Sequence, residues 1–174
     1  FKLAVPEGEE EELWSFLQSN FSTKILQEQA PNLSSSTETE FFIDQYFDDG
    51  NKSLFAQKAG ARYRQRFLGD SLLKALVQLK LPDVDTTGVA RREVKFSLYE
   101  NIKRDDRMAM HPFWKHIKPK DRADVDLVLA QLSTRGEDLQ PALNLEQLRR
   151  RVYISEDGSA LMTITLDRVS SAYF

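Results

Sequence analysis

Three arginines at alternate positions are the feature of this sequence that points most directly to chemistry. Arg62, Arg64 and Arg66 occupy every second position of the segment 60–66. In a β-strand alternate side chains share one face, so these guanidinium groups would repel one another unless an anion or carboxylates lay between them. A second segment repeats the alternation with Arg91, Glu93 and Lys95. The pattern therefore predicts two strands whose charged sides form a working surface.

Phosphate binding is the chemistry that such a surface suits. Arginine binds phosphate bidentately and lysine acts as a point charge, and Lys80 lies on the polar side of another predicted strand. Carboxylates such as Glu93 and Asp167 would separate the like charges and hold Mg²⁺ or Mn²⁺ through oxygen ligands. The divalent ion would then neutralise developing charge and orient a nucleophile. The alternative is an antiparallel sheet with one solvated face, which is common and needs no ligand.

The composition excludes several other kinds of site and partner. The 174 residues include no cysteine, which rules out disulfides, thiolate catalysis and cysteine-bound zinc. His111 and His116 are five positions apart, which is not the spacing of a helical metal-binding pair. The formal net charge of −3 argues against general nucleic-acid binding, whereas locally concentrated basic residues fit a small polyanion. No apolar run approaches about 20 residues and no secretory segment begins the chain, so we expect no membrane segment and favour a cytoplasmic location.

Periodicity and turn signals predict an α+β fold, mainly antiparallel β-strands with a few helices packed outside. The predicted helices cover 9–20, 23–29 and 121–132. The predicted strands cover 38–48, 61–68, 75–81, 89–99, 149–155 and 161–168. Residues 1–5 are typical of the end of a strand, 31–36 of a loop, and 143–148 of a short helix or an irregular lead-in. The length favours a single domain.

The order of several short motifs resembles that of CYTH domains, the triphosphate tunnel metalloenzymes. Asp44-Gln45-Tyr46-Phe47-Asp48, followed by Gly60-Ala61-Arg62-Tyr63-Arg64, is similar to that family's D-x-Y-F-D and G-x-x-L-R-x-R run. The later motifs follow in the same order: Leu79-Lys80-Leu81-Pro82, Arg91-x-Glu93, a basic strand at 149–153 and a strand ending in Leu166-Asp167. The resemblance covers residues 38–168.

This resemblance implies a closed antiparallel tunnel with basic and acidic side chains pointing inward. Members hydrolyse inorganic triphosphate or thiamine triphosphate, cyclise ATP, remove RNA 5′ phosphates or, in the vacuolar transporter chaperone branch, polymerise polyphosphate. The expected ligand is therefore tripolyphosphate, a nucleoside triphosphate or polyphosphate, with Mg²⁺ or Mn²⁺ as cofactor. The implied phosphate-binding residues are Arg62, Arg64, Lys80, Arg91, and Arg150 or Arg151. The implied catalytic residues are Glu93 and Lys80, and the implied metal ligands are Glu93 and Asp167.

Two departures from the family pattern keep alternatives open. The family's N-terminal Glu-x-Glu-x-Lys strand is represented only by Phe1-Lys2-Leu3, and the chain stops at Phe174 before a further acidic strand. We therefore expect a single CYTH-like domain over 1–174 that lacks its terminal acidic strands. The leading hypothesis is a metal-dependent triphosphatase or related phosphoryl transferase. A catalytically inactive module would bind polyphosphate or a nucleotide without turnover, and a purely structural β domain would bind neither.

Overall fold

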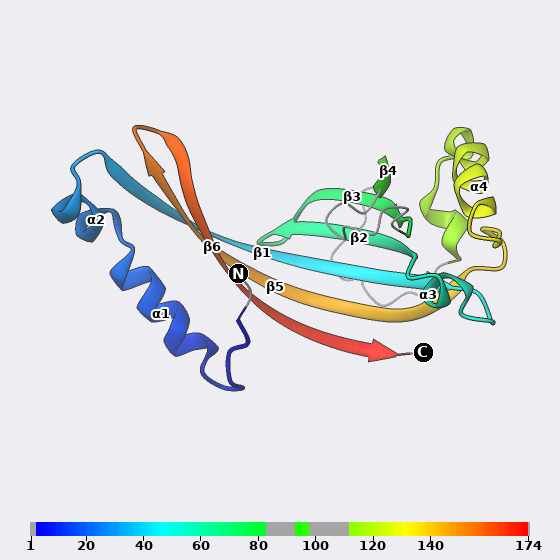
Figure 1. Cartoon of the computed structure of the whole chain (residues 1–174), viewed down its shortest axis with the longest axis horizontal. Coiled ribbons are helices and arrows are strands. Elements are labelled where there is room, and N and C mark those ends of the chain that lie inside the picture. The colour runs from blue at the N-terminus through cyan, green and yellow to red at the C-terminus, as the bar shows by residue number, and fades with distance from the viewer. Residues whose placement is uncertain (1–2, 83–92, 98–111, 174) are drawn as a thin grey trace. The chain divides into compact units, whose positions relative to one another are not determined.

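The computed structural model describes residues 3–82, 93–97 and 112–173, and it confirms the α+β class (Figure 1). The helices are α1 (Glu10–Asn20), α2 (Thr23–Gln29), α3 (Ser53–Ala56) and α4 (Arg122–Ala130), with 3-10 helices at Phe113–His116 and Pro119–Asp121. The strands are β1 (Leu33–Asp48), β2 (Gly60–Leu68), β3 (Ser71–Lys80), β4 (Glu93–Ser97), β5 (Gln140–Glu156) and β6 (Ser159–Tyr173). None of the helices in the described part of the chain has the length and apolar character needed to cross a bilayer.

The strands described form one antiparallel sheet in the order β4-β3-β2-β1-β5-β6. Register within this sheet gathers polar residues from three strands. Gln78 of β3 lies opposite Arg62 of β2 on one side and opposite Lys95 of β4 on the other. Lys80 lies opposite Glu93 in the same ladder. Because directly paired residues of antiparallel strands point to the same face, this register alone brings the five side chains to one side of the sheet.

The chain divides into two compact units, each with its own core. One unit comprises Phe1–Phe41 and Gln147–Val169, and the other comprises Phe42–Glu146 and Ser170–Phe174. In the first unit Leu17 of α1 packs with Val152 and Ile154 of β5. The amphipathic face of α1 therefore covers the apolar side of β5. The expectation of a single domain stays a prediction.

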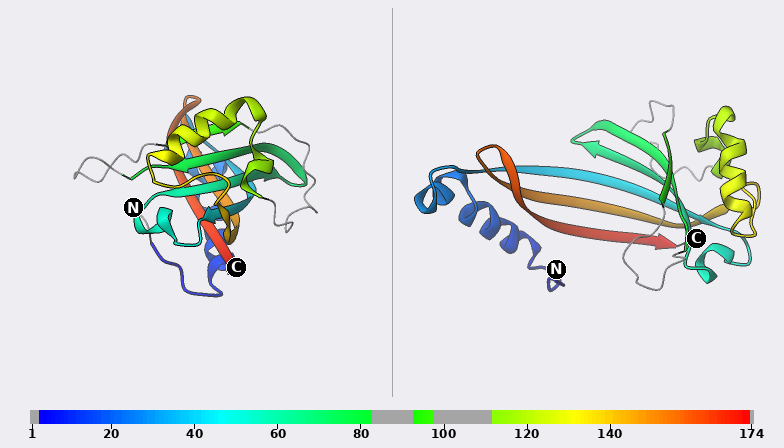
Figure 2. Two further views of the ribbon diagram at one scale, coloured as in Figure 1. Left: turned by 90° about the vertical axis from the view of Figure 1, so that its right-hand side faces the viewer. Right: turned by 45° about the horizontal axis from the view of Figure 1, so that its top comes forward.

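The core of the second unit explains why the arginines of β2 are kept on one face. Burial alternates strictly along β2, and its buried positions include Ala61 and Tyr63. These side chains pack with Val77 and Leu79 of β3 and with Leu129 of α4. Figure 2 shows α4 beside β2 and β3. Since alternate residues point to opposite faces, the arginines between the buried positions must project to the other side of the sheet.

Three of the sequence-based assignments were wrong. Residues 31–36, predicted as a loop, include the beginning of β1 at Leu33, and residues 143–148, predicted as a helix or lead-in, lie within β5. Residues 3–5, predicted as the end of a strand, have no regular secondary structure. Long-range pairing overrides local propensity in β1 and β5, since these strands are neighbours in the sheet. The hydroxyls of Ser34 and Ser155 lie 3.1 Å apart across this pair.

Two consecutive aspartates hold the connection between β1 and β2. Asp48 accepts hydrogen bonds from the backbone N–H groups of Leu54 and Phe55, both at 3.0 Å, at the beginning of α3. Asp49 accepts the N–H of Ser53 at 2.9 Å and the hydroxyl of Thr134 at 3.1 Å. The final aspartate of the Asp44–Asp48 motif therefore anchors the beginning of α3.

The stability of this connection should depend on pH through Asp49. The Ser53 N–H lowers the pKa of Asp49, against the opposing effect of burial and with help from Thr134. A carboxyl whose pKa is lower in the folded state stabilises the fold above the pKa of the unfolded chain, about 3.9, and loses that contribution as pH falls through the folded value. We expect Asp49→Asn to cost about 1 kcal/mol of unfolding free energy at neutral pH, and the cost to shrink at about pH 3. Urea unfolding at both pH values measures the loss of unfolding free energy. Asp126→Asn, on the exposed side of α4, is the control. A loss in Asp49→Asn that is equal at both pH values would contradict the prediction.

Gly136 is required by a close approach of an aromatic ring. A Cβ atom at this position would lie 2.1 Å from Cζ2 of Trp114, whose ring is fixed by Phe113 at 5.5 Å between centroids. We expect Gly136→Ala to destabilise the protein by about 1–3 kcal/mol, because the indole must move out of a packed site. Gly50→Ala is the matched control, since a Cβ there meets nothing within 4 Å. Thermal unfolding of both variants tests the assignment, and equal midpoints would refute it.

Candidate functional site

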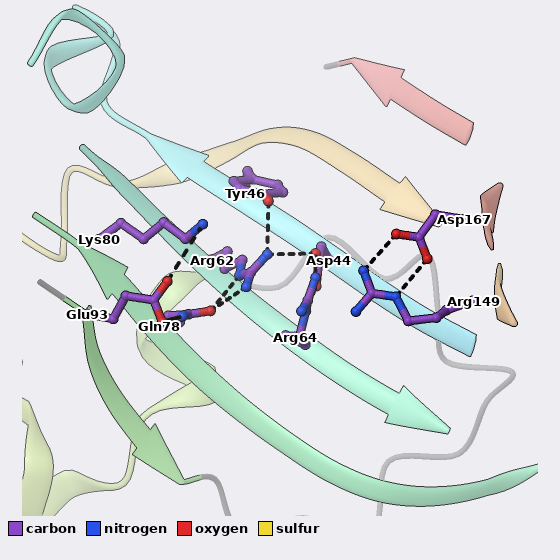
Figure 3. Close-up of polar contacts among 9 residues, drawn as sticks. All are labelled: Asp44, Tyr46, Arg62, Arg64, Gln78, Lys80, Glu93, Arg149 and Asp167. Carbon is purple, nitrogen blue, oxygen red and sulfur yellow. Dashed lines mark hydrogen bonds and ion pairs between the residues drawn. The ribbon is translucent and has the colours of Figure 1, made fainter. Parts of the chain in front are cut away.

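A buried carboxylate lies between two of the predicted phosphate-binding arginines (Figure 3). Asp44 of β1 has a side chain only 4% exposed, and its Oδ2 accepts from Nη1 of Arg62 at 3.1 Å and from Nη2 of Arg64 at 2.5 Å. Its Oδ1 accepts from Nε of Arg64 at 2.6 Å, so Arg64 binds the carboxylate bidentately. One negative charge thus separates two guanidinium groups that share a strand face, as the alternation requires.

The two arginines differ in how many of their N–H groups have partners. Arg62 donates from Nη1 also to the hydroxyl of Tyr46 at 3.1 Å, and from Nε and Nη2 to Oε1 of Gln78 at 2.8 and 2.5 Å. Arg64 instead lies over the ring of Phe42, with Cζ 4.9 Å from the centroid. Within the described residues, Nη1 of Arg64 has no hydrogen-bond partner. Arg62 is therefore anchored on nearly all sides, whereas Arg64 keeps N–H groups that can meet an anion.

Gln78 continues this network to the predicted carboxylate of β4. Its Nε2 donates to Oε2 of Glu93. The same carboxylate faces Nζ of Lys95 at 3.1 Å and Nζ of Lys80 at 3.9 Å. Partial burial by itself raises the pKa of Glu93, but the hydrogen bond and charge of Lys95, the charge of Lys80 and the amide of Gln78 outweigh it and lower that pKa. Glu93 is thus held as a carboxylate by two lysines and an amide.

A second charged network occupies the other unit. Arg149 of β5 binds the carboxylate of Asp167 of β6 bidentately, at 2.7 and 2.8 Å. Arg151 donates to Glu40 of β1, whose side chain is fully buried, and lies 3.6 Å from a carboxylate oxygen of Glu38. These pairs cross three neighbouring strands.

Tyr153 completes this network beside Arg151. Its hydroxyl donates to Glu38 at 2.9 Å and accepts from Arg151 at 3.3 Å. Burial and the hydrogen bond to Glu38 raise the pKa of Tyr153. The hydroxyl therefore remains a proton donor to Glu38 at neutral pH.

The three consecutive arginines of β5 do not act together. Arg150 binds the carboxylate of Glu11 on α1, with one N–H···O distance of 2.7 Å, and its Cζ lies 5.6 Å from the ring centroid of Trp14. Its guanidinium therefore packs against α1, while those of Arg149 and Arg151 bind acids of β6 and β1. The alternative of Arg150 or Arg151 was left open by the sequence, and the strand's alternation separates the two.

One predicted site residue, Arg91, lies outside the described part of the chain; it was expected to bind phosphate. Other residues were missed because no role was assigned to them from the sequence: Asp44, Tyr46, Gln78, Glu38, Glu40 and Tyr153. A signal for the acids was present, since Glu38, Glu40 and Asp44 occupy even positions of one predicted strand.

The carboxylates offer the oxygen donors that Mg²⁺ and Mn²⁺ prefer, but not a complete set of ligands. Among the described residues, no three His, Asp or Glu side chains come together as a metal site. Glu93 is paired with Lys80 and Lys95, and both oxygens of Asp167 are engaged by Arg149. These residues do not by themselves assemble the metal site that the motifs imply.

Comparison with known proteins places the chain in a family. No curated protein matches it. Among solved structures, the PH1819 protein of Pyrococcus horikoshii shares 17% identity at a TM-score of 0.45, with 83% of this chain and 64% of that one covered. The protein bh2851 of Bacillus halodurans, described as a candidate adenylate cyclase, shares 16% identity at a TM-score of 0.47, with 91% and 75% covered. Likenesses at this level carry no inference about activity.

The family comparison covers nearly the whole chain. Residues 15–173 match the CYTH domain, a span that includes β1 to β6 and all of the charged contacts described above except the Arg150–Glu11 pair. This match agrees with the motif resemblance and with the antiparallel sheet. The chain therefore belongs to the CYTH domain family.

Proposed function

We propose that this protein binds a triphosphate or polyphosphate on the charged face of β2, β3 and β4 and, with a divalent metal ion, hydrolyses it or transfers one of its phosphoryl groups. The family binds triphosphates with metal, which supports the ligand class. The observation that carries the proposal is the arginine pair held by buried Asp44. A buried carboxylate that orients two guanidiniums is typical of a preorganised anion site, because the cost of ordering the cations is met before the ligand arrives.

The charge of this face suits a polyanion. Arg62, Arg64, Lys80 and Lys95 meet the two carboxylates of Asp44 and Glu93, which leaves two positive charges in excess. A triphosphate carries about four negative charges at neutral pH. Arg64 presents N–H groups to the ligand, and Lys80 adds a point charge two residues beyond Gln78 on the same side of β3. We propose these two as direct phosphate ligands, with Arg62 beside them.

The other residues that the sequence predicted are kept as separate proposals. Arg91 stays a proposed ligand on the strength of its motif, and Arg151 is preferred to Arg150, whose guanidinium is bound to Glu11. Glu93 and Asp167 are each proposed to supply one carboxylate to a divalent ion. The metal would neutralise phosphate charge, and the arginines and lysine would orient the chain of phosphates.

A binding module without turnover is the second candidate. It is favoured by one observation: in the part of the chain that the structure describes, Glu93 and Asp167 are each tied to basic side chains and no third acid joins either of them. Such a protein would sense or hold polyphosphate or a nucleotide. The binding module and the enzyme would have the same anion site, but the module would not hydrolyse or transfer the bound phosphate.

Phosphate release separates the two candidates. We expect the full-length protein to release inorganic phosphate from tripolyphosphate in the presence of Mg²⁺ or Mn²⁺, and EDTA to abolish the release, because metal neutralises the charge that develops on the phosphate oxygens. Boiled protein and EDTA-treated protein serve as controls. Binding without metal-dependent turnover would overturn the enzyme and leave the module.

The role of Arg64 can be tested by binding alone. We expect Arg64→Gln to weaken tripolyphosphate binding by about 10-fold or more, since a charge-assisted hydrogen bond to a phosphate is lost. Arg135→Gln removes the same charge from an exposed side chain that pairs with Glu137, and it should leave the affinity unchanged. Isothermal titration calorimetry measures both, and an equal loss in the two variants would argue against a defined anion site.

A further inference from the structure

The side chain of Gln78 connects a proposed phosphate-binding residue to a proposed catalytic carboxylate. It is 3% exposed, and its carboxamide lies between Arg62 and Glu93. Oε1 accepts two N–H groups of Arg62, at 2.8 and 2.5 Å, while Nε2 donates to Oε2 of Glu93. No sequence motif singled it out, since on its strand it reads only as a polar residue between apolar ones.

We infer that Gln78 is a positioning residue of the anion site, which fixes the guanidinium of Arg62 and keeps the carboxylate of Glu93 from pairing with it. This inference rests on the proposed phosphate-binding function. Gln78 does not itself need to touch the ligand. It acts through the two charged groups that it holds apart.

The need for an amide at this position follows from the opposite charges of its two neighbours. Arg62 offers N–H donors, and Glu93 offers acceptor oxygens. A carboxamide is a neutral side-chain group that accepts at one atom and donates at another. A carboxylate would satisfy Arg62 but repel Glu93, and a hydrocarbon would leave both charged groups without those partners.

The strand register explains how one residue serves two strands. Gln78 lies directly opposite Arg62 on β2 and directly opposite Lys95 on β4. Glu93, two residues before Lys95, shares that residue's side of β4, and Nζ of Lys95 lies 3.1 Å from its carboxylate. The amide therefore sits in the central strand of a three-strand set, where a side chain can reach both neighbours.

The separation has an electrostatic consequence for the ligand. If Glu93 paired directly with Arg62, one positive charge of the face would be neutralised where the phosphates are proposed to bind. With the amide between them, the carboxylate is instead matched by Lys95 and Lys80. The charge of Arg62 is then not neutralised by Glu93. Arg62 and Arg64 both contact Asp44, which holds the two guanidinium groups in place.

The test compares Gln78→Met and Gln78→Glu with wild type in calorimetric titrations with tripolyphosphate, carried out in EDTA so that no metal contributes. We expect about a 10-fold rise in Kd for Gln78→Met, as is usual when a partner that orients a ligating side chain is lost. Gln78→Glu should weaken binding at least as much, because it adds a negative charge beside the phosphates. Gln57→Met is the matched control: its amide donates to the backbone carbonyls of Ser53 and Leu132, away from any charged group, and its Kd should equal that of wild type.

A double-mutant cycle shows whether Gln78 acts through Arg62. We expect the fold-increase in Kd of the double variant to be smaller than the product of the fold-increases in Arg62→Gln and Gln78→Met. Each single substitution already breaks the hydrogen bonds between Gln78 and Arg62. Losses that multiply independently would overturn the inference. A Kd for Gln78→Met equal to that of the wild-type protein would also overturn the inference. The proposed function would still be supported in that case, provided that the wild-type protein binds tripolyphosphate. If wild type binds tripolyphosphate neither in EDTA nor with Mg²⁺ or Mn²⁺, the proposed function and the inference are both overturned.

A measurement on the wild-type protein guards against a variant that fails to fold. The Nε–H proton of Arg62 should exchange slowly with water in NMR spectra of the free protein, because Gln78 accepts it. The Nε–H of Arg135, whose side chain is 73% exposed, supplies the reference for fast exchange. Equal exchange rates for the two arginines would overturn the inference.

Discussion

The arrangement of the charged face depends on one interaction, the sharing of buried Asp44 by Arg62 and Arg64. A carboxylate that is 4% exposed would be costly without cationic partners, and two adjacent guanidiniums would repel each other without it. The two arginines therefore offset the cost of burying Asp44, and Asp44 offsets the repulsion between the two arginines. Removal of one member of such a buried group costs about 3–5 kcal/mol, because an uncompensated charge remains. Tyr46 and Gln78 fix Arg62 further, so the geometry of the face is set by the fold before any ligand binds.

The two units show the same chemistry with different partners. In each, arginines on one strand find carboxylates on a neighbouring strand, as Arg64 does with Asp44 and Arg151 with Glu40. The run Arg149–Arg151 shows how strongly strand geometry governs such residues. The middle arginine stabilises the packing of α1 through Glu11, and the outer two join the charged network. Three identical neighbours thus divide between a structural role and a candidate functional one.

The sequence predicted the faces of the strands well but not the contacts between them. Alternation along β2 is a local property, so the common face of Arg62 and Arg64 follows from their spacing alone, and the buried Ala61 and Tyr63 confirm it. The pairing of Gln78 with both Arg62 and Glu93 depends on the register of three strands, which the alternation within one strand does not determine. The early beginning of β1 and the full length of β5 escaped prediction for the same reason. Their ends are stabilised by each other rather than by their own residue preferences.

The strict alternation of β2 also limits how this protein could change in length during evolution. A one-residue insertion or deletion between Gly60 and Arg66 would shift every following side chain to the opposite face, and arginines would then replace Tyr63 and its neighbours in the core. The irregularity in pairing between Arg66 and Phe67 lies beyond this stretch, next to the Gly69 turn, where φ is +56°. Length variation is therefore compatible with the hairpin tip, whereas related sequences should keep a constant number of residues from Gly60 to Arg66.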